Sequence, residues 1–405
     1  MDKLLEKYVS EEYSTKKALL YKVPLQIRKT NFFEEIQKMR RETAIQTPLK
    51  DVTGTNLWFN ITEKIVENIN VVEQNAMIKL DAYIPEGMHG KVLEDVLLEE
   101  ALSSSAIEGA FSTKKRVREL IKKKLSPIEK SEKMLVNNFK ALEYILDNIH
   151  KPLDREFLFR IWGMITEGAL EEGSITNSYR DDDVHVENAF ENVYTAPNCD
   201  EVPAMMADLI NYFNMVDDTP PIVKASIIHF YFVYVHPFFD GNGRTARALA
   251  ALYLIKSNYE FFKFISISTI LQDKRNAYYK VILDSETHEG DITYFIEFYT
   301  KLLVETVETM LNKYITEYFI EFLDAKEMEL NERQIKVLKI LLQAKDTSVN
   351  AKKYMKLTSV TQETARTDLN GLVDLHLLDK AAVKRSHEFK LKNVEEIIAA
   401  LTNKR

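Results

Sequence analysis

Two apolar helical segments joined by a short glycine-containing turn constrain the fold of this chain more than any other feature. Residues 222–235 are almost wholly apolar or aromatic, and apolar residues continue at helical spacing from Arg244 through Leu254. A helix that is hydrophobic on most sides must be covered by other elements of the protein. Gly241 and Gly243 allow the connection to turn tightly. The sequence therefore predicts a buried helix, a tight turn and a second helix.

Other segments also have helical character, and together they predict a mainly α fold. Glycine and proline are scarce, with 11 and 10 among 405 residues. Apolar residues recur at spacings of three and four in residues 92–109, 130–149, 154–169 and 203–216. A chain of this length usually forms two or three domains. We predict three: an N-terminal region (1–120), a helical domain (121–325) and a C-terminal domain (326–405).

Composition limits the class of protein. The balance of 45% hydrophobic and 29% charged residues is typical of soluble globular proteins. No apolar run is long enough to cross a membrane, and the first residues lack the pattern of a signal peptide. We therefore expect a cytoplasmic protein with no membrane partner. Cys199 is the single cysteine, which excludes an intrachain disulfide, and no zinc-ligand spacing occurs.

The C-terminal residues differ in charge and pattern from the rest. The net charge of the chain is 54 − 62 = −8, whereas residues 331–405 contain 15 basic and 9 acidic residues, about +6. Three helices followed by two strands around 378–391 follow the order of a winged helix-turn-helix domain. Residues 358–372 would form its turn and recognition helix, with Lys384 and Arg385 on the wing. Such a domain could bind DNA or another protein, and the sequence leaves both open.

A polar segment between Gly173 and Pro203 predicts a short exposed β-hairpin. Residues 182–186 and 192–194 have strand-like alternation, and residues 187–189 between them have the composition of a turn. The hairpin precedes the first of the two apolar helices.

The turn between the apolar helices carries residues suited to binding phosphate. Residues 241–243, Gly-Asn-Gly, can direct several main-chain amides inward at the N-terminus of the next helix, which forms an anion-binding nest. Arg244 and Arg247 are three residues apart, so both guanidinium groups can reach one polyphosphate chain.

The same turn also offers a base and a metal ligand. The carboxylate of Asp240 suits Mg²⁺, which usually takes one or two protein oxygens together with phosphate oxygens and water. His236 can accept a proton from an attacking hydroxyl near neutral pH. A glycine pair alone is most often an ordinary turn. The combination of a base, a carboxylate, a nest and two arginines within a dozen residues indicates a catalytic site instead.

Residues 236–247, HPFFDGNGRTAR, resemble the HxFx(D/E)GNGRxxR signature of Fic-domain proteins at every defining position. The resemblance implies a Fic-type helical bundle that transfers AMP from ATP·Mg²⁺ to a Tyr, Thr or Ser hydroxyl of a target protein and releases pyrophosphate. It implies His236 as the base, Asp240 as the Mg²⁺ ligand and Phe238 as the anchor of the loop. Asn242 and the loop amides would hold the α-phosphate, and the two arginines the outer phosphates. The implied nucleotide contacts are Gly241, Asn242, Gly243, Arg244, Thr245, Ala246 and Arg247.

The resemblance extends beyond this loop. In the family, a hairpin before the motif acts as a flap that pairs with the backbone of the target and covers the nucleotide. Residues 184–196 fit that place, and the residues nearest the nucleotide would be Val193, Tyr194, Thr195 and Ala196. Residues 275–279 resemble the family's paired-tyrosine segment, which implies that Tyr278 and Tyr279 line the adenine pocket.

The predicted helix 92–109 carries the family's inhibitory pattern (S/T)xxxE(G/N). Ser104, Glu108 and Gly109 fill its defining positions. The resemblance implies that Glu108 pairs with Arg247 and takes the place of the γ-phosphate, so that basal activity is low. In some relatives this glutamate also positions water for removal of AMP, and the sequence leaves that reaction open here.

Two classes of function follow. The first is an autoinhibited AMP-transferring enzyme that modifies a target protein, with itself as a default substrate. The alternative is a DNA-binding regulator with a nucleotide-sensing Fic-like domain. A sensor would need Arg244 and Asp240 but no base, so the intact His236 favours the enzyme. Relatives that transfer a phosphate or phosphocholine tend to depart from this loop. A homodimer could hold or release the helix of Glu108, and the sequence leaves the oligomeric state open.

Overall fold

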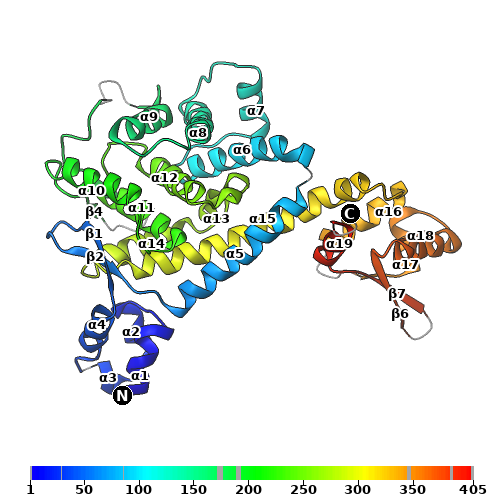
Figure 1. Cartoon of the computed structure of the whole chain (residues 1–405), viewed down its shortest axis with the longest axis horizontal. Helices are drawn as coiled ribbons and strands as arrows, with labels where there is room; N and C mark the ends of the chain where they lie inside the picture. The colour runs from blue at the N-terminus through cyan, green and yellow to red at the C-terminus, as the bar shows by residue number, and fades with distance from the viewer. Residues whose placement is uncertain are drawn as a thin grey trace. The chain divides into compact units, whose positions relative to one another are not determined.

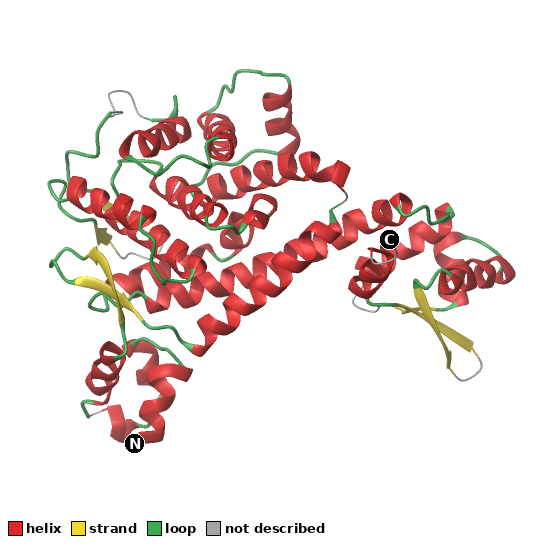
Figure 2. Cartoon of the chain, viewed as in Figure 1, coloured by secondary structure: helices red, strands yellow, loops and turns green. Residues whose placement is uncertain are grey.

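The computed structural model describes residues 2–28, 30–84, 86–170, 177–187, 193–343, 348–383 and 386–402. Helices dominate this part of the chain, and its strands form three small antiparallel sheets (Figure 2). The predicted mainly α fold is confirmed. Of the helices in the described ranges, none combines the length and the apolar character that crossing a bilayer requires.

The chain divides into two compact units. The first contains Met1–Val72 and Leu93–Thr306, and the second contains Glu73–Val92 and Val307–Arg405. Figure 1 shows two long helices, α5 (Glu63–Tyr83) and α15 (Thr293–Ala325). Each contributes residues to both units. The predicted division into three domains, with ends at residues 120 and 325, stays a prediction. The periodicity of a long helix does not show where one packing unit ends within it.

The other elements that lie wholly or mostly in the first unit are, in chain order, α1 (Asp2–Glu6), the π-helix η1 (Lys7–Glu11), α2 (Lys16–Lys22), α3 (Leu25–Arg28), α4 (Phe32–Glu42), β1 (Ile45–Lys50), β2 (Asn56–Phe59), α6 (His89–Ile107), α7 (Lys114–Lys122), α8 (Lys130–Asp147), α9 (Arg155–Thr166), β3 (His185–Glu187), β4 (Val193–Thr195), α10 (Val202–Asn214), α11 (Pro221–Val235), α12 (Asn242–Lys256), the 3₁₀-helix η3 (Glu260–Phe264), α13 (Ile267–Asp273) and α14 (Arg275–Glu286). The helices predicted within residues 92–109, 130–149, 154–169, 203–216 and 222–235 correspond to α6, α8, α9, α10 and α11.

The second unit contains η2 (Glu86–Met88), α16 (Glu332–Gln343), β5 (Ser348–Val349), α17 (Ala351–Thr358), α18 (Gln362–Asp374), β6 (Leu378–Val383), β7 (Ser386–Leu391) and α19 (Val394–Thr402). The three helices and two strands predicted after residue 331 are present, and β7 lies between β5 and β6 in the sheet. Asp368 of α18 is buried and accepts hydrogen bonds from the Tyr354 hydroxyl at 2.9 Å and from Arg333 Nε at 2.8 Å. One carboxylate therefore ties α16, α17 and α18 together.

The apolar helix α11 lies at the centre of the first unit, as its sequence predicts. Nearly all of its side chains are buried, including Lys224 and His229. It packs along α12, whose Ala-rich first half allows close approach of the two helices. The turn between them, residues 236–241, therefore lies at one end of the core, where helices α9 and α12 also meet.

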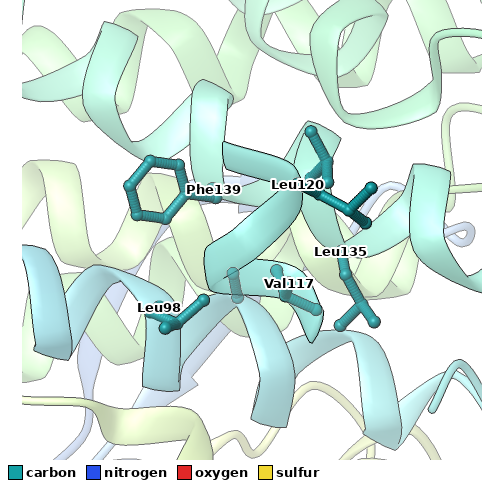
Figure 3. Packing of buried hydrophobic residues seen from close by; sticks show 7 residues of the cluster. Leu98, Val117, Leu120, Leu135 and Phe139 are labelled. Carbon is teal, nitrogen blue, oxygen red and sulfur yellow. The ribbon is translucent and has the colours of Figure 1, made fainter. Parts of the chain in front are cut away.

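An apolar cluster docks α6 on the helices that surround this core. It contains Leu98 and Ala101 of α6, Val117 and Leu120 of α7, and Leu135, Val136 and Phe139 of α8 (Figure 3). On another side of α6, the Glu100 carboxylate accepts hydrogen bonds from the Ser266 hydroxyl at 3.0 Å and from the Ser268 amide at 2.9 Å. Packing and a polar anchor thus fix the C-terminal end of α6, where Ser104 and Glu108 occur.

Candidate active site

His236 ends α11 in an unusual backbone conformation. Its φ and ψ are 51° and 58°, in the left-handed region, which costs a residue other than glycine about 1 kcal/mol or more. Its main-chain N–H donates to the Phe232 carbonyl at 3.1 Å, and its carbonyl accepts from Arg180 Nε at 2.9 Å. This conformation ends the helix and starts the loop that follows.

The surroundings of His236 keep its imidazole neutral. Burial lowers its pKa to about 4, and the positive charge of Arg180 adds to this effect. The Val233 carbonyl and the carboxylates of Glu108 and Asp240 act in the opposite direction. A neutral imidazole can accept a proton throughout the neutral pH range, which a general base requires.

Hydrogen bonds and ring stacking give the loop its shape. The side chain of Asn242 accepts from the Phe238 amide at 3.0 Å and donates to the Phe238 carbonyl at 2.6 Å. The buried Phe238 ring stacks on Trp162 with centroids 4.0 Å apart, and Trp162 Nε1 donates to the Asp240 carbonyl at 2.9 Å. Gly241 has φ 84°, and a Cβ there would lie 2.7 Å from Thr166 Cγ2. A larger residue at position 241 would therefore force the loop apart.

Two buried guanidinium groups face the start of α12 with donors to spare. Arg244 donates to the Ile165 carbonyl and to Asp240 Oδ1, both at 3.1 Å, and its Nε is buried without a partner among the described residues. Nη1 of Arg247 is likewise buried without one, and it lies 3.1 Å from where a Cβ on Gly243 would be. Buried donors without acceptors are costly. Together with the free amides of a helix N-terminus, they fit a polyphosphate.

Glu108 lies over the same turn of α12. Its Oε1 accepts from Arg247 Nη2 at 2.8 Å, and a Cβ on Gly243 would be only 2.2 Å from that oxygen. The Ser104 hydroxyl and carbonyl accept from Arg247 Nε and Nη2, both at 2.8 Å. Gly109, at φ 84°, ends α6, and the Ala110 amide donates back to the Ser105 carbonyl at 3.0 Å. This glycine stop directs Glu108 onto the turn.

Asp240 is the carboxylate that fits a metal ion in this loop. Its side chain is about two-fifths exposed, and its Oδ1 accepts from the Gly241 amide and from Arg244. Across the residues that the structure describes, no group of three or more His, Cys, Asp or Glu side chains could enclose a metal. Mg²⁺ usually takes one or two protein oxygens beside phosphate and water. The role of Asp240 as its ligand stays a prediction.

Comparison with known proteins agrees with this geometry. Residues 152–254 match the Fic/DOC family. The chain contains a Fic domain. It is 33% identical over 121 residues to a protein adenylyltransferase Fic from Nematostella vectensis and 33% identical over 91 residues to one from Drosophila yakuba. These alignments cover 28% and 22% of the chain. The chain spans about a quarter of the first relative's length (26%) and 17% of the second's.

Solved structures share the fold. A Fic family protein from Desulfovibrio desulfuricans G20 superposes with a TM-score of 0.55 at 20% identity, covering 82% of this chain and 97% of that one. A Fic domain containing signaling protein from Bacteroides thetaiotaomicron has a TM-score of 0.50 at 19% identity, covering 62% and 97%. At these identities the likeness concerns the fold alone.

Tyr278 and Tyr279, the two tyrosines predicted to line an adenine pocket, differ in their exposure to solvent. Tyr278 is only 2% exposed, and its hydroxyl lies 2.8 Å from Nε2 of the buried His229. Tyr279 is partly exposed, with the Arg275 guanidinium 5.6 Å from its ring centroid. Tyr279 therefore has ring surface available to a nucleobase, whereas Tyr278 is enclosed in the core. The adenine contacts predicted for both residues stay predictions.

The predicted hairpin is present beside the Fic loop. β3 and β4 pair antiparallel with His185 opposite Thr195 and Glu187 opposite Val193. Ala196 is buried, and its amide donates to the Val184 carbonyl at 3.2 Å. Of the predicted turn residues 187–189, Glu187 belongs to strand β3 instead, and Asn188 and Ala189 lie outside the described residues. The nucleotide contacts predicted for Val193, Tyr194, Thr195 and Ala196 stay predictions.

Two residues that contact the Fic loop were not predicted from the sequence. Trp162 of α9 stacks on Phe238 and bonds the Asp240 carbonyl. Arg180, ahead of the hairpin, bonds the carbonyl of His236. Trp162 fits the apolar face of a helix and Arg180 sits among charged residues, so neither has a local signal. Only the fold brings them to the loop.

We expect the buried His229 to make the folded domain less stable in acid. Burial, helped by the charge of Arg247, lowers its pKa to about 3. The imidazole of His229 therefore binds a proton more tightly in the unfolded chain than in the folded one. The stabilising contribution of the neutral, buried His229 is fully present above about pH 6.5 and is lost as the pH falls toward 3. We expect the free energy of unfolding of the wild type, minus that of His229→Gln, to fall by up to about 1.4 kcal/mol per pH unit in this window. A difference that does not change with pH would contradict this expectation.

Proposed function

We propose that the protein transfers AMP from ATP to a hydroxyl group of a target protein. The observation that carries this proposal is a buried histidine, whose lowered pKa favours the neutral form, in one loop with two buried arginines that keep unpartnered N–H donors among the described residues. The named relatives are protein adenylyltransferases, which supports the same chemistry. The target would present its Tyr, Thr or Ser hydroxyl along the flap of β3 and β4.

The reaction would follow from the positions of the loop residues. The imidazole of His236 takes the proton of the acceptor hydroxyl as its oxygen bonds the α-phosphorus, and the bond to the pyrophosphate oxygen breaks. The amides at the start of α12 hold the α-phosphate, and Arg244 and Arg247 hold the phosphates that leave. Asp240 would hold Mg²⁺, which offsets the charge of the phosphates when bound. Asn242, whose side chain is engaged with Phe238, acts by shaping the loop.

Glu108 would restrain this activity. The γ-phosphate of a productively bound ATP would need Arg247, which is engaged with Glu108 and Ser104. A carboxylate at the same place also repels the phosphate. ATP would then bind in a pose in which the α-phosphorus is misplaced relative to His236. A second reaction of the same site would be removal of AMP from the target by a water molecule that Glu108 positions. Release of labelled AMP from a modified target would measure this reaction.

The position of a radioactive label in ATP tests which group is transferred. With Glu108→Gly, we expect label from α-labelled ATP on the protein and none from γ-labelled ATP. Label from γ-labelled ATP would indicate phosphate transfer and would contradict the proposal. No label from either, with a cell extract supplying targets, would favour the nucleotide-sensing regulator.

A second candidate function concerns the C-terminal module, residues 331–402. We infer that it is a winged helix that binds duplex DNA, because Lys352, Lys353 and Lys356 on α17 are all exposed beside α18. Exposed Arg366 and Thr367 of α18 would then face the groove. The wing residues Lys384 and Arg385 lie outside the described residues.

DNA binding by this module would depend on salt. Replacing Lys352, Lys353 and Lys356 with Gln is expected to reduce the slope of log K against log salt by about one for each phosphate that a replaced lysine neutralises. Fluorescence anisotropy with a labelled duplex measures this slope. Gln at Lys122, Lys123 and Lys124, exposed at the end of α7, is the matched control. Equal reductions in both triple variants, or no binding by the wild type, would favour docking of a protein instead.

A further inference from the structure

One buried arginine holds three successive carbonyls of the catalytic turn. The side chain of Arg180 has no exposed surface. Its Nε donates to the His236 carbonyl at 2.9 Å and its Nη2 to the Val235 carbonyl at 3.4 Å. Its own main-chain amide donates to the Pro237 carbonyl at 2.9 Å. The C-terminal carbonyls of α11 are thus capped by a cation, which suits the negative end of a helix.

The same guanidinium binds both ends of the flap. Nη1 donates to the Asp182 carbonyl at 2.9 Å, where the chain enters the hairpin. Nη2 donates to the Pro197 carbonyl, where the chain leaves it. Between these points the Ala196 amide closes the strand pair on Val184. One side chain therefore joins the flap to the turn that carries His236.

The direction of His236 depends on the backbone that Arg180 binds. A left-handed residue other than glycine persists only where its surroundings impose it. Here the carbonyls of residues 235, 236 and 237 all accept from Arg180. The charge of Arg180 also lowers the pKa of His236, which favours the neutral base.

We propose that Arg180 is a positioning residue that fixes His236 and the flap in one geometry, so that a hydroxyl presented along the flap meets the base. This proposal rests on the proposed AMP transfer. Arg180 would act on the reaction through His236 and the flap, without touching ATP. A shift of about 1 Å between a base and its acceptor can cost about a hundredfold in rate.

The test uses Arg180→Gln and Arg180→Lys in the full chain carrying Glu108→Gly. We expect Arg180→Gln to lower kcat for AMP transfer about a hundredfold. The KM for ATP should change less than about threefold, because Arg244 and Arg247 stay in place. The acid limb of the pH–rate profile should move to higher pH when the charge is removed. Arg180→Lys keeps the positive charge but loses the planar guanidinium with its several donors. We expect it to leave the acid limb of the pH–rate profile in place and to recover part of kcat.

Arg40→Gln is the matched control, since Arg40 is also fully buried and donates to main-chain carbonyls. Its partners are the Tyr8 carbonyl at 2.6 Å, the Ser14 carbonyl and the Tyr294 hydroxyl, all away from the Fic loop. We expect thermal unfolding of both Gln variants to shift down, with kcat kept in Arg40→Gln. If Arg180→Gln left kcat and the pH–rate profile unchanged, the positioning role of Arg180 would be overturned while the proposed AMP transfer would stand. A Glu108→Gly parent that transfers no AMP would overturn the proposed function, and the inference with it.

Discussion

Glu108→Gly is expected to raise the rate of AMP transfer on the order of a hundredfold over the wild type. The substitution frees the N–H of Arg247 Nη2 that now donates to Glu108 Oε1 at 2.8 Å, and it removes a carboxylate from the turn at Gly243. A charge-assisted contact to phosphate contributes about 1.5–3 kcal/mol, and each 1.4 kcal/mol is tenfold in rate. Glu108 follows the last residue of α6, so glycine there does not interrupt the helix. Initial rates with α-labelled ATP measure the effect.

Two further variants separate charge from shape at this position. Glu108→Gln keeps the size of the side chain and removes its charge, so we expect a smaller gain than with glycine. Glu94→Gln removes a carboxylate from the same helix, where Glu94 pairs with Lys122 at 3.1 Å, and should leave the low basal rate unchanged. Equal rates in the wild type and Glu108→Gly, with ATP bound by both, would show that Glu108 does not restrain the enzyme.

His236→Ala, placed in the Glu108→Gly protein, is expected to lower the rate of AMP transfer by about 10²- to 10⁴-fold, the usual contribution of a general base. ATP affinity should be nearly unchanged, because the phosphates are held by the arginines and by the N-terminus of α12. Single-turnover rates and calorimetric ATP binding measure the two effects separately. The exposed His150 provides a matched control, and His150→Ala should keep the full rate. A full rate in the His236→Ala protein would exclude the imidazole as the base.

The sequence predicts most of the loop because its chemistry is contiguous. The base, the carboxylate, the glycines and the arginines lie within residues 236–247, and a helical turn brings such neighbours together without long-range information. The apolar helices were predictable for the same reason, since periodicity is local. The pairing of Glu108 with Arg247 spans 139 residues, and only the family resemblance suggested it before the fold was known.

Features that depend on tertiary packing could not be predicted from the sequence. Arg180 and Trp162 reach the loop from other elements, and their sequence neighbourhoods give no sign of it. Asn242 was predicted to contact phosphate. Nothing in the sequence indicates that its side-chain amide forms two hydrogen bonds with the main chain of Phe238. The sequence also did not show that α5 and α15 each belong to two units. One continuous helix can pack against different elements along its length, and its apolar periodicity does not change where that happens.

Intact mass spectrometry tests most directly whether base-dependent AMP transfer, restrained by Glu108, is the activity of this chain. The wild type, Glu108→Gly, and Glu108→Gly with His236→Ala would each be incubated with ATP and Mg²⁺, alone and with a cell extract. We predict the mass of added AMP on Glu108→Gly or on a protein of its extract, little with the wild type, and none with the double variant. AMP added equally by all three proteins, or by none of them, would contradict this prediction.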